Sequence, residues 1–319
     1  MRMKFSAGRL AAALVLGAIA FTANIASAQE IKEIRVALQK GGLLAIAKQR
    51  QVLEEEFKPL GITVKWYEFP YSNPLLEALN ANQLDFGSAG SAPPIFAQVA
   101  RENLVYAATQ PAGLNSEGIL AKDNSSIKKI SDLRGKRIGV AKGTSSHHFL
   151  VAALDKAGIK LDEIKVVYLA PADATAAFDK GDIDAWVVWD PYLAIAEKVH
   201  QARNITKDQR VVYSNNYLMA NREFALKHPD LLKRIVDRLI DIGKWAESNR
   251  PQLAQLLTDQ TGIPLDIERI VVDRGTFAIK YLDDGITAQQ QDVANRFAEL
   301  GLVPRKVDVQ KIVWKPATK

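Results

Sequence analysis

Four segments of the sequence place small or hydroxylated residues where a strand pattern gives way to a helix pattern. They are Gln39-Lys40-Gly41-Gly42, Gly87 to Pro94, Lys142 to His147 and Trp189-Asp190-Pro191-Tyr192. A helix N-terminus exposes N–H groups that have no intrahelical partner and carries about half a positive charge. Glycine lets the backbone approach a ligand closely, and serine or threonine adds a hydroxyl donor. Several such helix ends around one cleft would bind a compact oxyanion without a lysine or arginine in contact.

Each segment taken alone is also compatible with ordinary helix capping, because Ser, Thr and Asp are common N-cap residues. Thr144-Ser145-Ser146 stands apart, since one cap needs one hydroxyl and here three follow one another. Trp186 and Trp189 lie at the fourth segment, and we expect one of them in the core and the other over an apolar part of a ligand. His147 and His148 are adjacent and so point to different sides, which argues against a metal site.

Sequence motifs of bond-making chemistry are missing. The chain has no G-x-S-x-G, no G-x-x-x-x-G-K-[ST] and no G-x-G-x-x-G. Asp182 and Asp184 lie beside a strand start, where such a pair usually forms a turn. We therefore expect a binding protein that has no catalytic residue, no cofactor and no metal.

The N-terminus has the pattern of a secretory signal peptide. Arg2, Lys4 and Arg9 precede an apolar run over 10–21, and Ala26-Ser27-Ala28 offers a cleavage site after Ala28. The apolar run is shorter than the roughly 20 residues of a membrane span. The pattern predicts export to the periplasm and removal of residues 1–28.

Composition narrows the possibilities further. The chain of 319 residues has no cysteine, which excludes disulfides, thiolate metal sites, cysteine nucleophiles and a lipidated N-terminus. The leader holds three of the 42 basic residues, so the remaining chain carries a net charge of only +3. A charge that small gives no electrostatic reason to expect binding to nucleic acid or to a membrane.

Strand and helix patterns alternate twice along the chain, which predicts two α/β lobes with largely parallel sheets. Strands are expected at 34–38, 62–69, 85–89, 104–108, 118–121, 137–141, 165–169 and 185–188. Helices are expected at 43–57, 75–79, 95–100, 146–157, 172–179, 191–198, 231–248, 251–261, 265–272 and 288–300. We expect residues 29–117 and 217–319 to form lobe 1, and residues 118–216 to form lobe 2. A ligand cleft should lie between the lobes, which two crossing strands connect.

The sequence resembles the periplasmic aliphatic-sulfonate-binding proteins of ABC importers, the SsuA type. The resemblance runs nearly from end to end of the expected mature chain, in the family's order. It rests on Gln39-Lys40-Gly41, Glu77-Ala78-Leu79-Asn80, Pro93-Pro94-Ile95-Phe96-Ala97-Gln98, Lys142-Gly143-Thr144-Ser145-Ser146-His147, Pro171-Ala172-Asp173-Ala174, Asp184-Ala185-Trp186, Trp189-Asp190-Pro191-Tyr192 and Leu302-Val303-Pro304-Arg305-Lys306-Val307-Asp308.

The resemblance implies a two-lobed periplasmic-binding-protein fold of type II and the capture of an aliphatic sulfonate by a monomer for an ABC permease. A related anion, such as a sulfate ester, taurine or nitrate, stays open as an alternative, and an enzyme on the same fold is a remoter one. The expected ligand-binding residues are Gln39, Ser72, Gly90, Ser91, Gly143, Thr144, Ser145, Ser146, Trp189 and Asp190.

Two positions depart from the family pattern. Ser91 stands where the family often has an acidic residue, and Ser72-Asn73-Pro74 stands where it tends to have Gly-Pro. Both departures fall near the expected mouth of the cleft, so they leave the organic tail of the ligand undetermined. A serine in place of an acid should also ease the approach of an anion.

Overall fold

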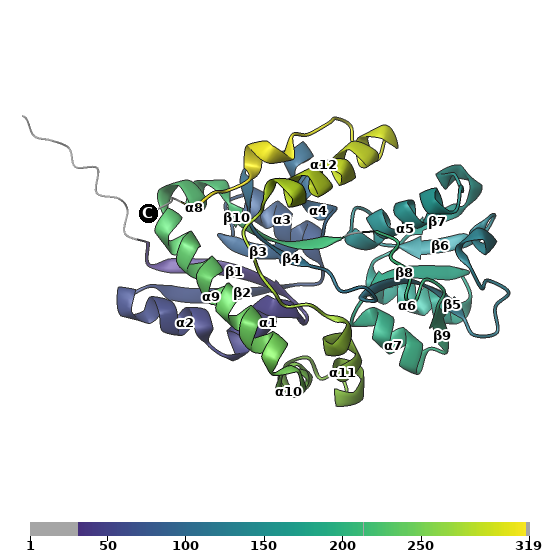
Figure 1. Cartoon of the computed structure of the whole chain (residues 1–319), viewed down its shortest axis with the longest axis horizontal. Coiled ribbons are helices and arrows are strands. Elements are labelled where there is room, and N and C mark those ends of the chain that lie inside the picture. The colour runs from purple at the N-terminus through teal and green to yellow at the C-terminus, as the bar shows by residue number, and fades with distance from the viewer. Residues whose placement is uncertain (1–30, 213, 317–319) are drawn as a thin grey trace, which may run out of the picture. The chain divides into compact units, whose positions relative to one another are not determined.

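Two five-stranded sheets organise the part of the chain that the computed structural model describes, residues 31–212 and 214–316 (Figure 1). Sheet 1 has the order β2-β1-β3-β10-β4. Its strands are β1 Glu33–Gln39, β2 Thr63–Phe69, β3 Phe86–Ala89, β4 Leu104–Pro111 and β10 Asn215–Asn221. Sheet 2 has the order β7-β6-β8-β5-β9. Its strands are β5 Glu117–Lys122, β6 Arg137–Val140, β7 Lys165–Tyr168, β8 Ala185–Trp189 and β9 Ala202–Asn204. The expected signal peptide, residues 1–28, lies outside the described residues.

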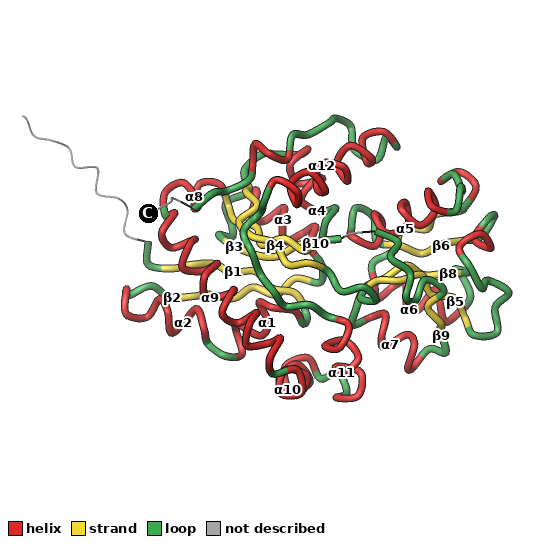
Figure 2. The backbone as a smooth tube through the Cα atoms, viewed as in Figure 1, coloured by secondary structure: helices red, strands yellow, loops and turns green. Residues whose placement is uncertain are grey.

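Helices flank both sheets (Figure 2). Sheet 1 carries α1 Gly42–Gln49, α2 Val52–Phe57, α3 Ser72–Asn80, α4 Pro93–Ala100, α8 Arg222–Lys227, α9 Pro229–Ser248, α10 Arg250–Thr261, α11 Leu265–Arg274 and α12 Asp284–Glu299. Sheet 2 carries α5 Ser145–Lys156, α6 Pro171–Lys180 and α7 Tyr192–Val199. Short 3₁₀ helices are η1 Lys58–Leu60, η2 Ile130–Leu133, η3 Leu161–Glu163 and η4 Val309–Ile312. Each sheet with its helices is a lobe, and the fold is the expected two-lobed α/β architecture; the lobe boundaries at 117/118 and 216/217 stay predictions.

The two sheets have the same topology, although no internal repeat stands out in the sequence. In sheet 1, β10 is antiparallel to β3 and β4, whereas β1 is parallel to β2 and β3. In sheet 2, β5 is antiparallel to β8 and β9, whereas β6 is parallel to β7 and β8. The reversed strand is in each case the one on which the chain enters the sheet from the other lobe. The prediction of largely parallel sheets therefore holds for four of the five strands in each sheet.

Side chains alternate across sheet 1 and build two cores. Leu218 and Ala220 of β10 belong to the core beneath α1, α2 and α9, whereas Tyr217 and Met219 belong to the core beneath α3, α4 and α12. This is the period of two that a strand buried on both faces requires. The sequence pattern does not single out β10, because a strand covered on both faces need not show alternating polarity.

Sheet 2 is covered on both faces in the same way. Ala185 and Val187 of β8 face the core beneath α5, whereas Trp186 and Val188 face the core beneath α6 and α7. Trp186 is 2% exposed and is thus the core member of the tryptophan pair. Trp189 is the last residue of β8, and it lines the cleft described below.

The helix expected over 43–57 is wrong as a single element. α1 ends at Gln49, and Gln51 has a φ of 52°, a left-handed conformation that an α-helix does not contain. The turn redirects the chain so that Leu53 and Phe57 of α2 reach the same core as α1. The apolar spacing is compatible with one helix or with two. It indicates which residues are buried, and it does not indicate where the backbone leaves the helical conformation.

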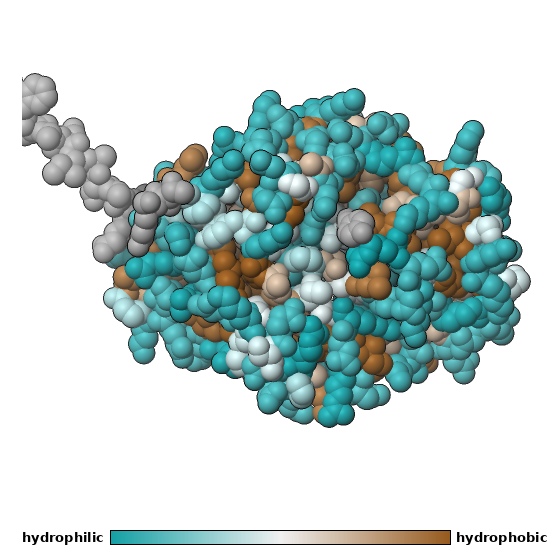
Figure 3. Space-filling view, viewed as in Figure 1, coloured by the Kyte–Doolittle hydropathy of each residue, from teal (hydrophilic) through white to brown (hydrophobic). Residues whose placement is uncertain are grey.

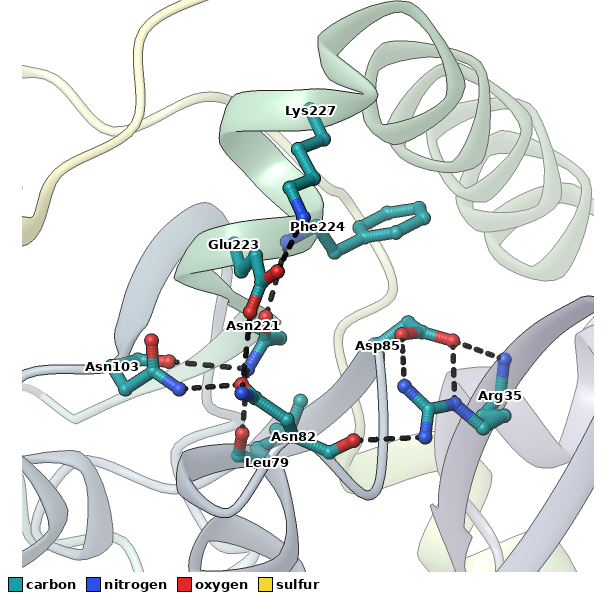
Figure 4. A network of polar contacts seen from close by, with 9 residues as sticks. All are labelled: Arg35, Leu79, Asn82, Asp85, Asn103, Asn221, Glu223, Phe224 and Lys227. Atoms are coloured by element: carbon teal, nitrogen blue, oxygen red, sulfur yellow. Dashed lines mark hydrogen bonds and ion pairs between the residues drawn. The ribbon is translucent and has the colours of Figure 1, made fainter. Parts of the chain in front are cut away.

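An arginine–aspartate pair recurs at the same place in both sheets. The Asp85 carboxylate, just before β3, accepts hydrogen bonds from Arg35 N at 2.7 Å, Nε at 3.1 Å and Nη2 at 2.7 Å (Figure 4). Asp184, just before β8, accepts the equivalent bonds from Arg137 at 2.8, 3.2 and 2.8 Å. One pair joins β1 to β3 and the other joins β6 to β8, the corresponding neighbouring strands of the two sheets.

An asparagine network closes the end of sheet 1 where β10 runs into α8. Asn221 Oδ1 accepts a hydrogen bond from Phe224 N at 3.0 Å and so caps α8, while Asn221 Nδ2 donates to Leu79 O at 2.8 Å and Asn82 Oδ1 at 2.7 Å (Figure 4). Asn103 Nδ2 also donates to Asn82 Oδ1, at 2.6 Å. The network fixes the outer ends of β3, β4 and β10 and leaves their opposite ends for the cleft.

The face of the molecule in Figure 3 is mostly hydrophilic, and the hydrophobic areas on it are separate from one another. The large exposed hydrophobic residues come from different parts of the chain; they are Leu60, Tyr67, Leu114, Tyr168, Val199 and Leu226. Among the described residues, the helices all lack the combination of length and apolar character that crossing a membrane would need.

The repeated pair provides a matched test of stability. Asp85→Ala should lower the free energy of unfolding by about 2 kcal/mol, because it removes a buried carboxylate and leaves the donors of Arg35 unpaired. Asp184→Ala should lower it less, since that pair is more exposed to solvent. Urea unfolding followed by circular dichroism measures both values. An equal loss in the two variants would contradict the role that we assign to burial.

Candidate functional site

A cleft of about 200 Å³ lies where strand ends of the two lobes meet. Its lining comes from the carboxyl ends of β1, β3 and β8, from helix starts, and from the crossing segments next to β4, β5 and β10. The lining residues are Gln39, Lys40, Gly41, Gly42, Leu43, Tyr71, Ser72, Ser88, Ala89, Gly90, Pro93, Gln110, Ala112, Ser116, Glu117, Thr144, Ser145, Trp189, Asp190, Ser214, Asn216 and Leu218. All four segments singled out in the sequence contribute to it.

The start of α5 brings the hydroxyl-rich segment into the cleft. Thr144 is the N-cap, and its hydroxyl is used within the protein, since Oγ1 donates to Ala141 O at 2.7 Å and accepts from His147 N at 3.4 Å. Ser145, the first residue of the helix, lies beside it in the lining. The first N–H groups of any helix lack an intrahelical acceptor. Thr144 therefore acts as the cap, and the start of α5 with Ser145 is the part able to donate to a ligand.

The start of α1 is built from two glycines with left-handed backbone. Gly41 has a φ of 78° and Gly42 a φ of 79°, a region that other residues adopt only with strain. Gly41, Gly42 and Leu43, at the start of α1, all line the cleft. Gln39, the last residue of β1, donates from Nε2 to Ser72 Oγ at 3.2 Å and to Ser88 O at 3.1 Å, so it ties the ends of β1 and β3 to the start of α3.

The start of α4 differs from the others because Pro93 and Pro94 occupy its first two positions. Proline has no N–H to donate. What this segment brings to the cleft is the backbone of Gly90. A Cβ placed on Gly90 would lie 2.9 Å from Ser145 Cβ and 3.1 Å from its Oγ, so glycine here permits lobe 1 to approach lobe 2 closely.

Asp190, at the end of β8, occupies the start of α7 with its own carboxylate. Its Oδ1 accepts from Ala194 N at 3.0 Å and lies 3.4 Å from Arg274 Nη1, while Arg274 Nη2 lies 2.6 Å from Glu197 Oε2. Burial raises the pKa of Asp190 to about 7, and Arg274 opposes the rise. Because an acid already caps this helix, its N-terminus is not available to an external anion. Asp190 Oδ2 is buried and makes no hydrogen bond within the described residues.

Three of the expected residues lie outside this lining. Ser91 is 1% exposed, and its hydroxyl lies 3.2 Å from His148 Nδ1. Ser146 is fully buried and donates to Glu117 Oε1 at 3.4 Å. Gly143 lines a neighbouring groove of about 580 Å³ that shares Tyr71 with the cleft. The seven others, Gln39, Ser72, Gly90, Thr144, Ser145, Trp189 and Asp190, lie together in the lining, and their binding roles stay predictions.

Sequence reasoning missed several polar lining residues, and Glu117 is the acid among them; the others are Tyr71, Ser88, Gln110, Ser116, Ser214 and Asn216. Glu117 is the first residue of β5, directly after the first crossing, and is 9% exposed. Burial raises the pKa of Glu117 to about 7, although hydrogen bonds from Ser145 and Ser146 oppose the rise. No local signal marks this glutamate, because only the fold buries it against the hydroxyls of α5.

The two adjacent histidines are structural. His147 Nδ1 accepts from Gly143 N at 3.2 Å, and both imidazoles pack on the ring of Phe297. Burial lowers the pKa of each to about 4, so both are neutral at physiological pH. No group of three or more His, Cys, Asp or Glu able to hold a metal ion occurs in the described part of the chain.

Ion pairs and apolar contacts also join the lobes outside the cleft. Besides the Arg274 pairs, Arg296 of α12 binds Asp155 of α5 through Nε at 2.8 Å. Ala194 of α7 packs in one cluster with Ile263 and Ile267, which lie before and within α11. The cleft is thus bordered by contacts that hold the lobes against each other.

Comparison with known proteins agrees with this architecture. The family model described as "NMT1/THI5 like" matches residues 57–241. The alkanesulfonate-binding protein SsuA from Xanthomonas axonopodis pv. citri bound to MOPS is similar with a TM-score of 0.85 and 31% identity, covering 89% of this chain and 99% of that one. The periplasmic aliphatic sulphonate binding protein SsuA from Escherichia coli gives a TM-score of 0.81 and 36% identity, covering 90% and 94%.

A further relative is the taurine-binding periplasmic protein of Escherichia coli (strain K12), which is 32% identical over 263 residues, 78% of each chain. The family match covers more than half of the sequence, and the similarity to the SsuA structures extends over nearly all of the described residues. The chain therefore belongs to the NMT1/THI5-like family and has the fold of its periplasmic binding proteins.

Proposed function

We propose that this protein captures an aliphatic sulfonate in the periplasm and delivers it to an ABC importer, without catalysing a reaction. The observation that carries the proposal is the convergence of helix starts, glycines and the Ser145 hydroxyl on one small cleft between the lobes. Likeness to sulfonate-binding relatives over the whole described chain supports the choice of ligand.

The chemistry of the cleft suits a sulfonate headgroup. A sulfonate spreads one negative charge over three oxygens and stays ionised at any physiological pH, so it is best bound by several moderate donors. The starts of α1, α3 and α5 supply backbone N–H groups, and Ser145 supplies a hydroxyl. Lys40, the lysine of the lining, is exposed at its edge. Each hydrogen bond to a charged group contributes roughly 1.5 to 3 kcal/mol, so four or five would offset the costs of ordering and reach micromolar affinity.

Delivery follows from the two-lobed construction. Ligand between the lobes favours the arrangement in which they are closed, and a membrane partner that recognises this arrangement receives only loaded protein. The expected partner is an ABC permease, and we propose that the protein acts as a monomer. The leader pattern over residues 1–28 supports export to the periplasm.

The same cleft offers donors to related anions. Sulfate esters, taurine and nitrate share the arrangement of oxygen acceptors, and one relative is named for taurine. They differ in what surrounds the oxygens, which the exposed edge of the cleft would distinguish. An enzymatic role finds less support, because the SsuA relatives named above are binding proteins.

A ligand panel tests the proposal directly. In titration calorimetry of the mature protein, ethanesulfonate and longer alkanesulfonates should bind with micromolar Kd, and sodium nitrate and sulfate should bind more weakly. The reason is that the smaller anions lack the organic tail that fills the rest of the cleft. Absence of heat and of any shift in Tm with millimolar alkanesulfonates would refute the proposal.

Removing one hydroxyl tests the site. Ser145→Ala should raise the Kd for ethanesulfonate about tenfold or more, because a donor to a charged group is lost at the start of α5. Ser248→Ala, on the exposed end of α9, is the matched control and should leave the Kd unchanged. An unaltered Kd in Ser145→Ala would place the headgroup elsewhere.

Adding one methyl group tests the close approach of the lobes. Gly90→Ala should weaken binding of the same ligand by at least tenfold while Tm changes little, since the new Cβ meets Ser145 and not the core of either lobe. Gly285→Ala, in the exposed first turn of α12, serves as the control. Calorimetry and thermal unfolding together separate loss of binding from loss of folding; equal affinity in both variants would argue against contact between the lobes at this point.

A further inference from the structure

The hydroxyls assigned to the anion in the sequence are bonded, in the structure, to an acid of the protein. Ser146 Oγ donates to Glu117 Oε1 at 3.4 Å, and the Ser145 hydroxyl bonds to the same carboxyl group. Glu117 itself lines the cleft beside Ser145. A sulfonate at the start of α5 would therefore share its nearest hydroxyl with this carboxyl.

Two anions cannot share that position without cost. Like charges a few ångströms apart repel strongly where water is excluded, and the usual outcome is that one acid keeps its proton. A sulfonate cannot take up a proton at physiological pH, whereas a buried glutamate can. The protonated carboxyl also gains an O–H, which turns an opposing charge into a further donor for the headgroup.

The surroundings of Glu117 favour it over its neighbours as the group that takes the proton. The nearest acid is Asp190, directly after β8 and opposite the start of β5. Burial raises its pKa to about 7 as well, but Arg274 Nη1 lies 3.4 Å from its Oδ1, whereas Glu117 is bonded to serine hydroxyls. Glu197 of α7 is bound to the same arginine. From α5 come Ser145, Ser146 and the neutral His147 and His148.

Two cations line cavities that Glu117 also lines. Lys40 is at the exposed edge of the cleft, and Arg210 shares with Glu117 the lining of a cavity of about 20 Å³. The causes that set the pKa of Glu117 are burial and the two serine hydroxyls, with no cation among them. Burial raises that pKa to about 7, close to the pH at which the protein would work.

We propose that Glu117 binds the sulfonate as a neutral acid and donates its O–H to the anion, so that capture of the ligand takes up one proton from solvent. The proposal rests on the proposed function and deepens it, since it assigns a specificity-determining residue to the same cleft. The proton goes from water to a Glu117 oxygen, no other bond forms or breaks, and the cleft gains no net charge on loading.

The sign of the pH dependence follows. Below pH 7 most of the free protein already carries the proton, so the affinity for ethanesulfonate is constant. Above pH 7 the proton must be taken up, so Kd should rise about tenfold per pH unit, or about a hundredfold between pH 6 and pH 9. At pH 8, calorimetry in buffers of different ionisation enthalpy should report uptake of about one proton per ethanesulfonate bound.

Glu117→Gln is the decisive variant, because the amide keeps the shape and the donor but cannot ionise. Its Kd for ethanesulfonate should stay near the wild-type value at pH 6, be constant to pH 9 and there be tens of times lower than that of the wild type. This is a gain of affinity that misfolding cannot imitate. Glu55→Gln, on the exposed face of α2, is the matched control and should keep the wild-type profile.

The possible outcomes distinguish a failure of the inference about Glu117 from a failure of the proposed function. Ethanesulfonate binding with a flat pH profile and no proton uptake would overturn the role of Glu117 and leave the proposed function standing. If the Kd of Glu117→Gln still rises with pH, another group takes up the proton, and Asp190 is the first candidate. That result would also overturn the role of Glu117. No ethanesulfonate binding by the wild type at any pH would refute the function and the inference together.

Discussion

Repulsion between buried negative charges is the constraint around which this cleft is arranged. The lining contains two carboxyl groups, Glu117 and Asp190, and one exposed lysine. Asp190 is held by Arg274 and by the N–H of Ala194, whereas Glu117 has two serine hydroxyls. Any anion that enters must be compensated by helix starts, by hydroxyls or by a proton. The site therefore offers dipoles and hydrogen-bond donors to a ligand, and Arg274 is occupied by Asp190 and Glu197.

The fold creates this site through the direction of its strands. In both sheets the parallel strands end at the cleft, and helices begin there because each strand leads into the helix that returns the chain. The single reversed strand of each sheet starts at the cleft after a crossing. Strand ends, helix starts and crossing segments therefore come to one place from seven separate parts of the sequence. The repeated Arg35–Asp85 and Arg137–Asp184 pairs lie at the opposite ends of the sheets and fix the frame.

Local chemistry decides which helix starts can serve a ligand, and they are not equivalent. α5 offers N–H groups and Ser145, whereas α4 begins with two prolines and α7 is capped by Asp190. The sequence pattern singles out the hydroxyls at 144–146 but does not distinguish the other three segments, because each contains small or polar residues. What separates them is whether a donor is already used within the protein, and this depends on partners far away in the chain, such as Arg274 for Asp190.

The sequence by itself determined the α/β class, the two-lobed organisation and most strands and helices. The reason is that the spacing of apolar residues within a short segment indicates whether it forms a helix or a strand. Of the ten residues that the sequence predicted for ligand binding, seven line the cleft. Only the tertiary structure decided that Ser91 and Ser146 are buried, that the helix over 43–57 breaks at Gln51, and that β10 completes sheet 1. Glu117 shows the reason most clearly. An acid at a strand start carries no local mark of its role, and it acquires one only when the fold buries it against the hydroxyls of α5, 28 residues or more along the chain.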